Sequence, residues 1–445
     1  MEEKKQRKFI NSRTMVALLA FGALNLALAG YVPKHENVLT DKIVQNSNNE
    51  KRQEGNWIWW ITRNYLVDGK DADLVFMGSS QMGSALYASE AEHLNHAVDT
   101  VTHRKSTLTE KLLHDKIGTD INAFNVSMGG AMVSDQFMMS KSLFNSLHKP
   151  KVVVVGVNPR DFIDNSMPSA SATDAFNYLS PYVELGQLAT CAFPDLIGWM
   201  DWQINNAMPA KTTGEQLKAW LPEVIIKALP TTPARVVSED GEVTAEAKPA
   251  GKQNGENAAG EAGEPAVKTA AGDAGNSDVL KAIYGNQGEV KPGQWKVVAC
   301  SWGAFKDNTQ EYRVRYKDSN PPIYQNQKKF FESYLAYLKQ ENIKVLVVGM
   351  PSLWPNRALL PDKFWNEFRG YLASTSTEYG AQFLDISADP RFEGKDYLDT
   401  VHLNSTGGNR LLNIITDAIA KNDNLASCLK ESSIAKKTAA TTNWQ

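Results

Sequence analysis

A serine, a histidine and an aspartate of this chain have the types and local settings that nucleophilic catalysis requires. Ser80 follows a short apolar run in VFMGSSQMGSAL (75–86), and DTVH (399–402) places Asp399 three residues before His402. A serine hydroxyl is a weak nucleophile until a neighbouring base takes its proton; a histidine can be that base, and an aspartate can fix its tautomer. These residue types therefore predict acyl-transfer chemistry with Ser80 as the nucleophile.

Other interpretations of the same residues stay open at this point. Ser80 could be only the N-cap of the helix expected from Gln81, because serine is a preferred capping residue. Ser79 could be the reactive serine, although the Gly-x-Ser register favours Ser80. His402 could be a solvated loop histidine, but it is the only histidine after His148 and lies in a strand-to-helix connection, which favours a functional role.

Residues after two further apolar runs supply candidate donors for the negative charge that develops on a carbonyl oxygen. NVSMGG (125–130) ends in Gly130, and GVNPRDF (156–162) contains Asn158. Backbone N–H groups and amide side chains are the usual donors of an oxyanion hole, and the N–H of the nucleophile can be a third. Gly130 could equally allow a tight turn, and Asn158 could be a turn residue before Pro159.

The charged residues near these motifs point to fewer functions. Arg160 is a candidate contact for an anionic substrate, with a structural ion pair as the competing interpretation. His93 and His96 have an i, i+3 spacing that can serve metals, but no Glu or Cys constellation accompanies them, so we assign no metal and no cofactor. The 47 basic and 50 acidic side chains nearly balance, and the formal net charge of −3 argues against a nucleic-acid partner.

Five apolar runs are the elements that must position these residues. They are DLVFMGSS (73–80), INAFNVSMGG (121–130), KVVVVGVNPRDF (151–162), IKVLVVGMPSLWPN (343–356) and AQFLDISAD (381–389). Buried strands that alternate with helical segments predict an α/β fold, a three-layer α/β/α arrangement with a mainly parallel central sheet. Ligands bind beyond the carboxyl ends of such strands, where the candidate residues lie.

The N-terminus has the pattern of a membrane-targeting segment. Basic residues precede an apolar run at 15–32 that only Asn25 interrupts. Eighteen residues rising ~1.5 Å each would span about 27 Å, close to the ~30 Å of a bilayer core. We expect a single-pass signal anchor that leaves all residues after 32 outside the cytoplasm. A cleaved signal peptide is the close alternative, because LALAG (26–30) offers small residues for cleavage.

Composition divides the rest of the chain. The expected parts are an anchor with its basic flank (1–32), a stalk and amphipathic helix (33–70), two portions of one α/β domain (71–164 and 323–427), an inserted cap or lid (165–322) and a flexible tail (428–445). Within the insertion, 231–278 has no aromatic residue and should be disordered, because it cannot bury enough apolar surface to offset its ordering entropy. Cys191, Cys300 and Cys428 allow one disulfide at most.

Four blocks of the chain, 73–84, 121–131, 151–162 and 396–410, resemble in order and strand-end placement the SGNH (GDSL-type) hydrolase superfamily. The resemblance implies a catalytic triad of Ser80, His402 and Asp399. It also implies an oxyanion hole made by the Ser80 N–H, Gly130 and Asn158. Two departures stand out. Ser79 replaces the aspartate of the usual Gly-Asp-Ser, and Pro159 follows the asparagine where many relatives have Asp.

The Gly-Ser-Ser opening, the expected anchor and the long insertion are more similar to the DltD and alginate O-acetylation branch than to secreted lipases. The resemblance implies a serine esterase or O-acyltransferase at the bacterial cell membrane, acting on a cell-envelope polysaccharide or another acylated polymer, with a membrane-bound O-acyltransferase as a candidate partner. Two alternatives stay open. One is a non-catalytic envelope binding or assembly protein, and the other is a lipid or thioester hydrolase.

Overall fold

The structure is a computed structural model, and it describes 56–69, 71–144, 148–207, 290–299 and 305–442, together with residues 19, 20 and 23. The chain divides into two compact units. One consists of Pro33–Asn206 and Ala271–Gln445, and the fold below is that of this unit. Nearly all of the expected anchor (15–32) and all of the expected disordered segment (231–278) lie outside the described residues. Within the described ranges, no helix combines the length and the apolar character that crossing a membrane would require.

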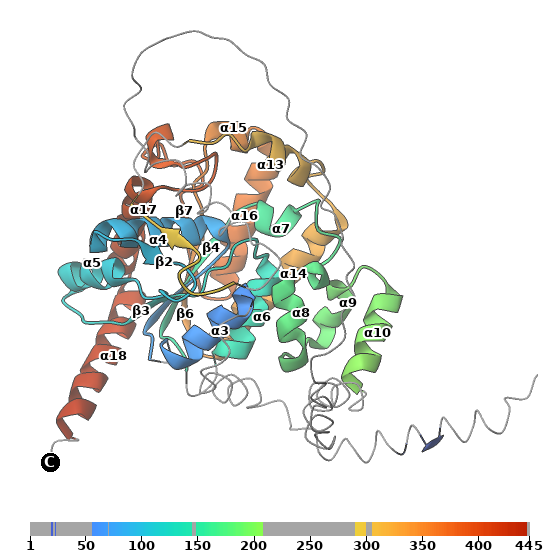
Figure 1. The fold of residues 1–445 in the computed structure, drawn as a ribbon, viewed down its shortest axis with the longest axis horizontal. Coiled ribbons are helices and arrows are strands. Elements are labelled where there is room, and N and C mark those ends of the chain that lie inside the picture. Colours follow the sequence, from blue (N-terminus) through green and yellow to red (C-terminus); the bar gives the residue numbers. More distant parts are fainter. Residues whose placement is uncertain are drawn as a thin grey trace, which may run out of the picture. The chain divides into compact units, whose positions relative to one another are not determined.

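A five-stranded parallel sheet forms the centre of this unit (Figure 1). Its strands are β1 (Leu74–Met77), β3 (Ala123–Asn125), β4 (Val152–Val157), β6 (Lys344–Gly349) and β7 (Gln382–Asp385), in the order β3-β1-β4-β6-β7. Each of the five apolar runs contributes one strand. The prediction of an α/β fold with a parallel central sheet is therefore confirmed.

The apolar runs are continuous because helices cover both faces of the sheet. In β1, Val75 and Met77 belong to one hydrophobic cluster, whereas Leu74 and Phe76 belong to another, as expected when successive side chains of a strand point to opposite faces. All six residues of β4 are buried. A strand with two buried faces has no position for a polar side chain, so its sequence shows no alternation.

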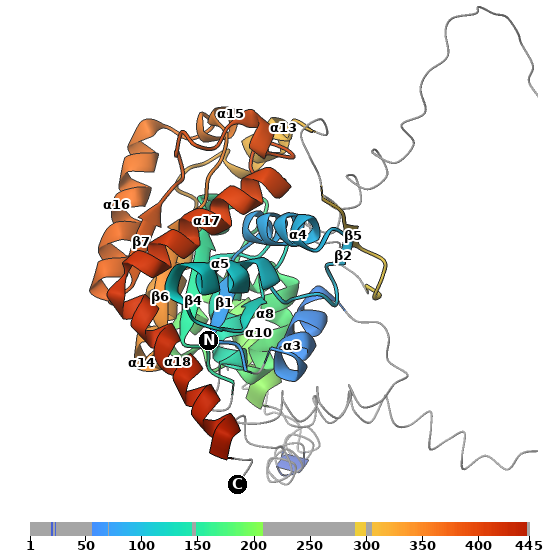
Figure 2. The same ribbon diagram turned by 90° about the vertical axis from the view of Figure 1, so that its left-hand side faces the viewer.

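The helices form a layer on each face (Figures 1 and 2). The first cluster joins the sheet to α3 (Trp57–Val67), α6 (Val133–Leu143), α8 (Asp174–Leu179), α14 (Pro322–Gln340) and α16 (Asp362–Glu378). The second joins it to α4 (Ser80–Leu94), α5 (Thr107–Ile117), α17 (Ser405–Lys421) and α18 (Asp423–Thr442). Figure 2 shows α5, α17 and α18 together on the side of the sheet that faces the viewer.

Smaller elements complete the unit. They are an antiparallel pair, β2 (Val98–Asp99) with β5 (Lys296–Val297), and the short helices α7 (Arg160–Ile163), α9 (Ala189–Ala192), α10 (Leu196–Ala207), α13 (Thr309–Arg315) and α15 (Trp354–Arg357). The strand β5 belongs to 290–299, which packs onto α3: the Trp60 indole N–H donates to the carbonyl oxygen of Val290 at 2.9 Å. Trp59, Trp60 and Trp295 are buried in the same cluster.

The C-terminal residues differ from the expected flexible tail. Helix α18 runs to Thr442, and Leu425 and Leu429 are buried against the sheet-covering layer. Further along, the Ser432 hydroxyl donates to the Asp73 carboxylate at 2.6 Å. Helix α18 is polar on average, but its two leucines one helical turn apart are enough to pack it against this layer. Of the three cysteines, Cys191 and Cys428 are free thiols and Cys300 lies outside the described residues.

The strand order locates the edge at which a ligand site is expected. The first strand in the sequence, β1, is the second strand of the sheet, and the next one, β3, lies at the edge beside it. The chain then crosses to the other side of β1, where β4, β6 and β7 follow in order, so the direction of winding reverses between β1 and β4. In doubly wound sheets a crevice opens beyond the carboxyl ends of the strands at this reversal. Ser80 lies three residues after the end of β1, and Asn158 directly follows β4. The topology therefore places two of the candidate residues at the switch point.

Candidate active site

Ser80 is the first residue of α4, not its cap. The N-cap position is held by Ser79, whose side chain makes no capping hydrogen bond. The N–H groups in the first turn of a helix have no intrahelical acceptor, and the helix dipole there favours negative charge. The Ser80 N–H is therefore placed where it can stabilise an anion.

Ser80, His402 and Asp399 form one chain of hydrogen bonds. Ser80 Oγ lies 2.9 Å from His402 Nε2, although the two residues are 322 positions apart in the sequence. His402 Nδ1 lies 2.6 Å from Asp399 Oδ2. Because a carboxylate only accepts, Nδ1 carries the hydrogen, and Nε2 is left to accept the hydrogen of the Ser80 hydroxyl. The three predicted residues are thus brought together in the order that a general-base relay needs.

The carboxylate of Asp399 is held from several directions. Its Oδ1 accepts the backbone N–H groups of Val401 and His402, each at 2.8 Å. Both Asp399 and His402 are almost completely buried, at 1% and 0% exposure. Burial by itself raises the pKa of Asp399, but the facing imidazole and the hydrogen bonds outweigh it and hold the pKa below its usual value. An ionised Asp399 at neutral pH keeps His402 in the tautomer described above.

The side chains of the two adjacent serines contact different residues. Ser79 is buried and faces β4, where its Oγ lies 3.4 Å from Asn158 Nδ2 and against the Asp161 carboxyl. Ser80, in contrast, faces His402. Of the two serines, only Ser80 therefore has an imidazole within hydrogen-bond reach.

Asn158 is fixed by Asp161. The Asp161 Oδ2 accepts from both the backbone N–H of Asn158, at 3.1 Å, and its side-chain Nδ2, at 3.0 Å. Complete burial raises the pKa of Asp161 to about 7, against the opposing effects of Arg160 and of the hydrogen bonds from Ser79 and Asn158. Asn158 thus lies beside the serine pair with its amide orientation set, and the long contact to Ser79 is the one that a substrate oxygen could replace.

Gly130 lies in the turn after β3. Its φ of +73° belongs to the left-handed region, which a glycine adopts without the steric cost that a Cβ brings. Within the described residues, the N–H groups of Gly129 and Gly130 have no acceptor. Gly129 lines the cleft beside Ser80, so this turn presents unused donors at the site.

Arg160 forms structural contacts within the protein. Its side chain is buried, and its Nη1 donates to the carbonyl oxygen of Ala131 at 3.0 Å. Its Nη2 pairs with Asp164 at 3.1 Å. These partners join the turn after β3 to α7, and Arg160 does not line the cleft beside Ser80. The ion pair named as the competing interpretation is therefore present, and the substrate contact stays a prediction.

A narrow cleft lies beside Ser80, with a volume of about 20 Å³. Its walls include Trp57, Tyr87, Thr100, Arg104 and Ser127. This volume is far below the range for sites that enclose a whole small molecule, and it admits only a small group of a larger substrate. Within the described part of the chain, no residue of 165–322 lines the cleft, and α8 and α9 pack instead into the core beside α6 and α14. The described part of the insertion therefore does not line this cleft, and the cap or lid stays a prediction.

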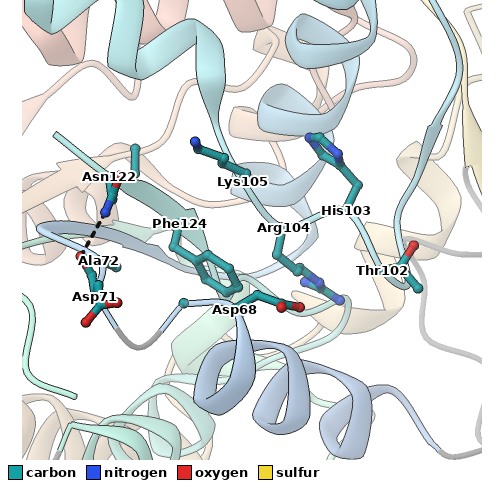
Figure 3. A pocket seen from close by; sticks show the side chains of 11 residues that line it. Asp68, Asp71, Ala72, Thr102, His103, Arg104, Lys105, Asn122 and Phe124 are labelled. Carbon is teal, nitrogen blue, oxygen red and sulfur yellow. Dashed lines mark hydrogen bonds between the residues drawn. The ribbon is translucent and has the colours of Figure 1, made fainter. Parts of the chain in front are cut away.

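A larger hollow lies at the opposite edge of the sheet, before β1 and β3 (Figure 3). Asp71, Asn122 and Phe124 are among its walls, and neither Ser80 nor His402 is. Because ligand sites of parallel sheets lie at the carboxyl ends of the strands, we place the chemistry in the cleft beside Ser80. Arg104 borders both spaces.

Most wall residues of the cleft had no assigned role from the sequence. Arg104 lies in THRKST (102–107), a connection whose spacing carries no motif, and Tyr87 lies on the apolar face of α4. No protein-family model matches the chain, and no curated protein matches it. The functional argument therefore depends on the geometry of the site.

Proposed function

We propose that this protein is an extracytoplasmic serine esterase or O-acyltransferase of the SGNH type. The observation that carries the proposal is the hydrogen-bond chain from Ser80 through His402 to Asp399. The strand order and the placement of Ser80 and Asn158 at the reversal of the sheet add support.

The first half of the reaction forms an acyl-enzyme. Ser80 Oγ attacks the carbonyl carbon of an ester while its proton moves to His402 Nε2, and Asp399 stabilises the resulting imidazolium. The developing oxyanion accepts hydrogen bonds from the Ser80 N–H and the turn that contains Gly130, and from the amide of Asn158. When the tetrahedral intermediate collapses, the alcohol leaves with the proton from Nε2, and the acyl group stays on Ser80.

The second half removes the acyl group. His402 Nε2 takes a proton from an acceptor hydroxyl as that oxygen attacks the acyl carbon, and it then returns the proton to Ser80 Oγ. Water as acceptor gives hydrolysis, and a sugar hydroxyl gives transfer. The same residues serve both outcomes.

The cellular setting belongs to the proposal as well. The basic and apolar pattern of the N-terminus supports attachment to the cell membrane or export from the cytoplasm. With the resemblance of the four blocks, it supports an acylated envelope polysaccharide or similar polymer as substrate, and a membrane-bound O-acyltransferase as partner.

Labelling of the full-length chain in detergent with a fluorophosphonate tests the proposal. Such a probe reacts with a serine that a neighbouring base activates. We expect the wild type and Ser79→Ala to be labelled, and Ser80→Ala and His402→Ala to lose labelling. The Ser79→Ala variant is the matched control, because it removes an adjacent hydroxyl that has no contact with His402.

Absence of labelling in a folded wild-type chain would contradict the esterase proposal. It would favour the alternative of a non-catalytic envelope protein that uses the cleft to bind a partner. Labelling that survives Ser80→Ala but not Ser79→Ala would show instead that Ser79 is the nucleophile, and would contradict the assignment to Ser80.

A further inference from the structure

Arg104 is a buried cation without a direct ion pair. Asp99 acts on it as a more distant charge, and the Asp99 oxygens accept hydrogen bonds from other residues. The Arg104 side chain is 3% exposed, and it forms no ion pair with any described carboxylate. Its Nη1 donates to the carbonyl oxygen of Ser127 at 3.0 Å, and its Cζ lies 5.6 Å from the ring centre of Tyr87. Its Nε is buried without a partner. One edge of the guanidinium is therefore unused by the described residues.

A second buried arginine of the described chain, in contrast, has a carboxylate partner. Arg160 is 7% exposed and pairs with Asp164 at 3.1 Å. The half-buried Arg315 contacts Glu311 with both Nε and Nη2. The corresponding edge of Arg104 carries no carboxylate. Burying a charge without a partner is costly, so an unpaired buried group at a site points to a ligand that completes it.

Trp57 adds a second unused donor to the same cleft. Its indole Nε1 is buried and has no acceptor among the described residues. An indole N–H and a guanidinium can only donate hydrogen bonds, so neither can satisfy the other. The Tyr87 hydroxyl is not available to either, because it donates to the carbonyl oxygen of Thr100 at 3.1 Å.

The walls of the cleft contain no negative charge that would compete for these donors. Arg104 is the only charged residue among the wall residues, which include no Asp or Glu in the described chain. The nearest catalytic carboxylate, that of Asp399, is committed to His402. Lys105, the next residue after Arg104, pairs with Glu110 at 3.3 Å and borders the hollow at the other edge of the sheet instead. The two side chains point in different directions in Figure 3.

We propose that the cleft binds a carboxylate of the ester substrate, with Arg104 and the Trp57 N–H as its donors. A single guanidinium matches the single charge of a carboxylate, whereas a phosphate monoester carries close to two charges and three acceptor oxygens. The substrate is then an acidic ester, in which the carboxylate lies near the ester that Ser80 attacks. This inference depends on the proposed function only in that Ser80 supplies the chemistry.

Two matched esters test the inference with the full-length chain in detergent. Both are acetyl esters of a fluorescent hydroxycoumarin; one carries a carboxylate on the ring and the other carries the carboxamide in its place. We expect the wild type to prefer the carboxylate ester in kcat/KM by at least about tenfold, as a charge-assisted hydrogen bond provides. Arg104→Gln should remove this preference, chiefly through KM, and lower kcat/KM for the carboxamide ester far less than for the carboxylate ester.

Lys105→Gln is the control, because it removes the same charge one residue away, outside the cleft. It should leave the preference unchanged. Equal losses for both esters in Arg104→Gln would assign Arg104 a structural role and overturn the inference, as would a wild type without preference. If Arg104→Gln does not fold, as judged by its thermal melt, Trp57→Phe takes its place, with a several-fold loss expected for the carboxylate ester alone.

A failure of the proposed function would be seen separately. If the wild type hydrolyses neither ester, binding of the free coumarin carboxylate and carboxamide is measured by fluorescence polarisation. Tighter binding of the carboxylate that Arg104→Gln abolishes would keep the inference while the esterase proposal falls. Equal binding of the two compounds would overturn the inference itself.

Discussion

Asp399 contributes to the site by holding one tautomer of His402, and this role can be tested without changing the shape of the side chain. In Asp399→Asn the amide can present a donor to Nδ1, which would move the imidazole hydrogen to Nε2 and remove the acceptor for Ser80. We expect the rate of acyl transfer to fall about ten-thousandfold, as judged by ester hydrolysis. A variant that melts like the wild type and keeps a tenth of its rate would contradict this role.

Asp161 makes the stability of the fold depend on pH. Its pKa is about 7 in the folded chain, compared with about 3.9 for a free aspartate. Between these values the folded state holds a proton that the unfolded state has lost, so the contribution of Asp161 to the free energy of unfolding falls as the pH rises through this window. Arg160 and Ser79 face the carboxyl and limit the effect.

The corresponding variant is Asp161→Asn, which cannot ionise. Relative to the wild type, its free energy of unfolding should rise between pH of about 4 and about 7 by on the order of a few kcal/mol, and should stay level outside that window. Urea unfolding of both proteins across this range measures the difference. The same offset at every pH would show that Asp161 does not bind a proton on folding.

The close packing of α17 against α4 brings His402 near Ser80. Ser80 begins α4, and α17 starts at Ser405, three residues after His402. Gly408 in the first turns of α17 lies against the backbone of Ala85, and a Cβ at this position would overlap the Ala85 carbonyl. The absence of a side chain therefore lets the helix that follows the base approach the helix that carries the nucleophile.

Gly408→Ala should accordingly weaken both the fold and the reaction. Overpacking of this kind costs about 1–3 kcal/mol, and we expect a lower melting temperature together with slower fluorophosphonate labelling. Gly370→Ala is the control in α16, because a Cβ there meets no atom within 4 Å. That change should stabilise the chain by about 0.5–1 kcal/mol and leave labelling unchanged. Similar effects of the two substitutions would contradict the argument.

The long insertion rejoins the described unit at a defined place. The strand β5, Trp295 and Val290 all lie after 278, and they pack against α3 and β2. Replacing 231–278 by a short Gly-Ser linker should therefore leave the melting temperature of the unit within a few degrees of the wild type, because the segment has no aromatic residue and offers little apolar surface to bury.

Trp295→Ala is the contrasting variant for this comparison. It removes a large buried side chain from the cluster with Trp59 and Trp60, and such changes cost about 3–5 kcal/mol. Thermal melts of both variants measure the difference. A larger loss from the linker replacement than from Trp295→Ala would show that 231–278 contributes to the stability of the unit.

The sequence by itself determined the features that depend on neighbouring residues. Each of the five strands was predicted because a strand buried on both faces must be a continuous apolar run. The i, i+3 spacing of Asp399 and His402 likewise placed a carboxylate next to an imidazole. Helix α18 was missed, because two docking leucines do not outweigh a polar average.

Only the tertiary structure decided which side chains meet. Ser79 and Ser80 are adjacent in the sequence, and their different directions follow from the turn between β1 and α4 and from what packs on each side of it. The role of Arg104 was not predictable either. Whether a buried cation has a partner depends on side chains from α3, α4 and the connections after β2 and β3, which are distant in the sequence and meet only when the sheet and its helical layers assemble.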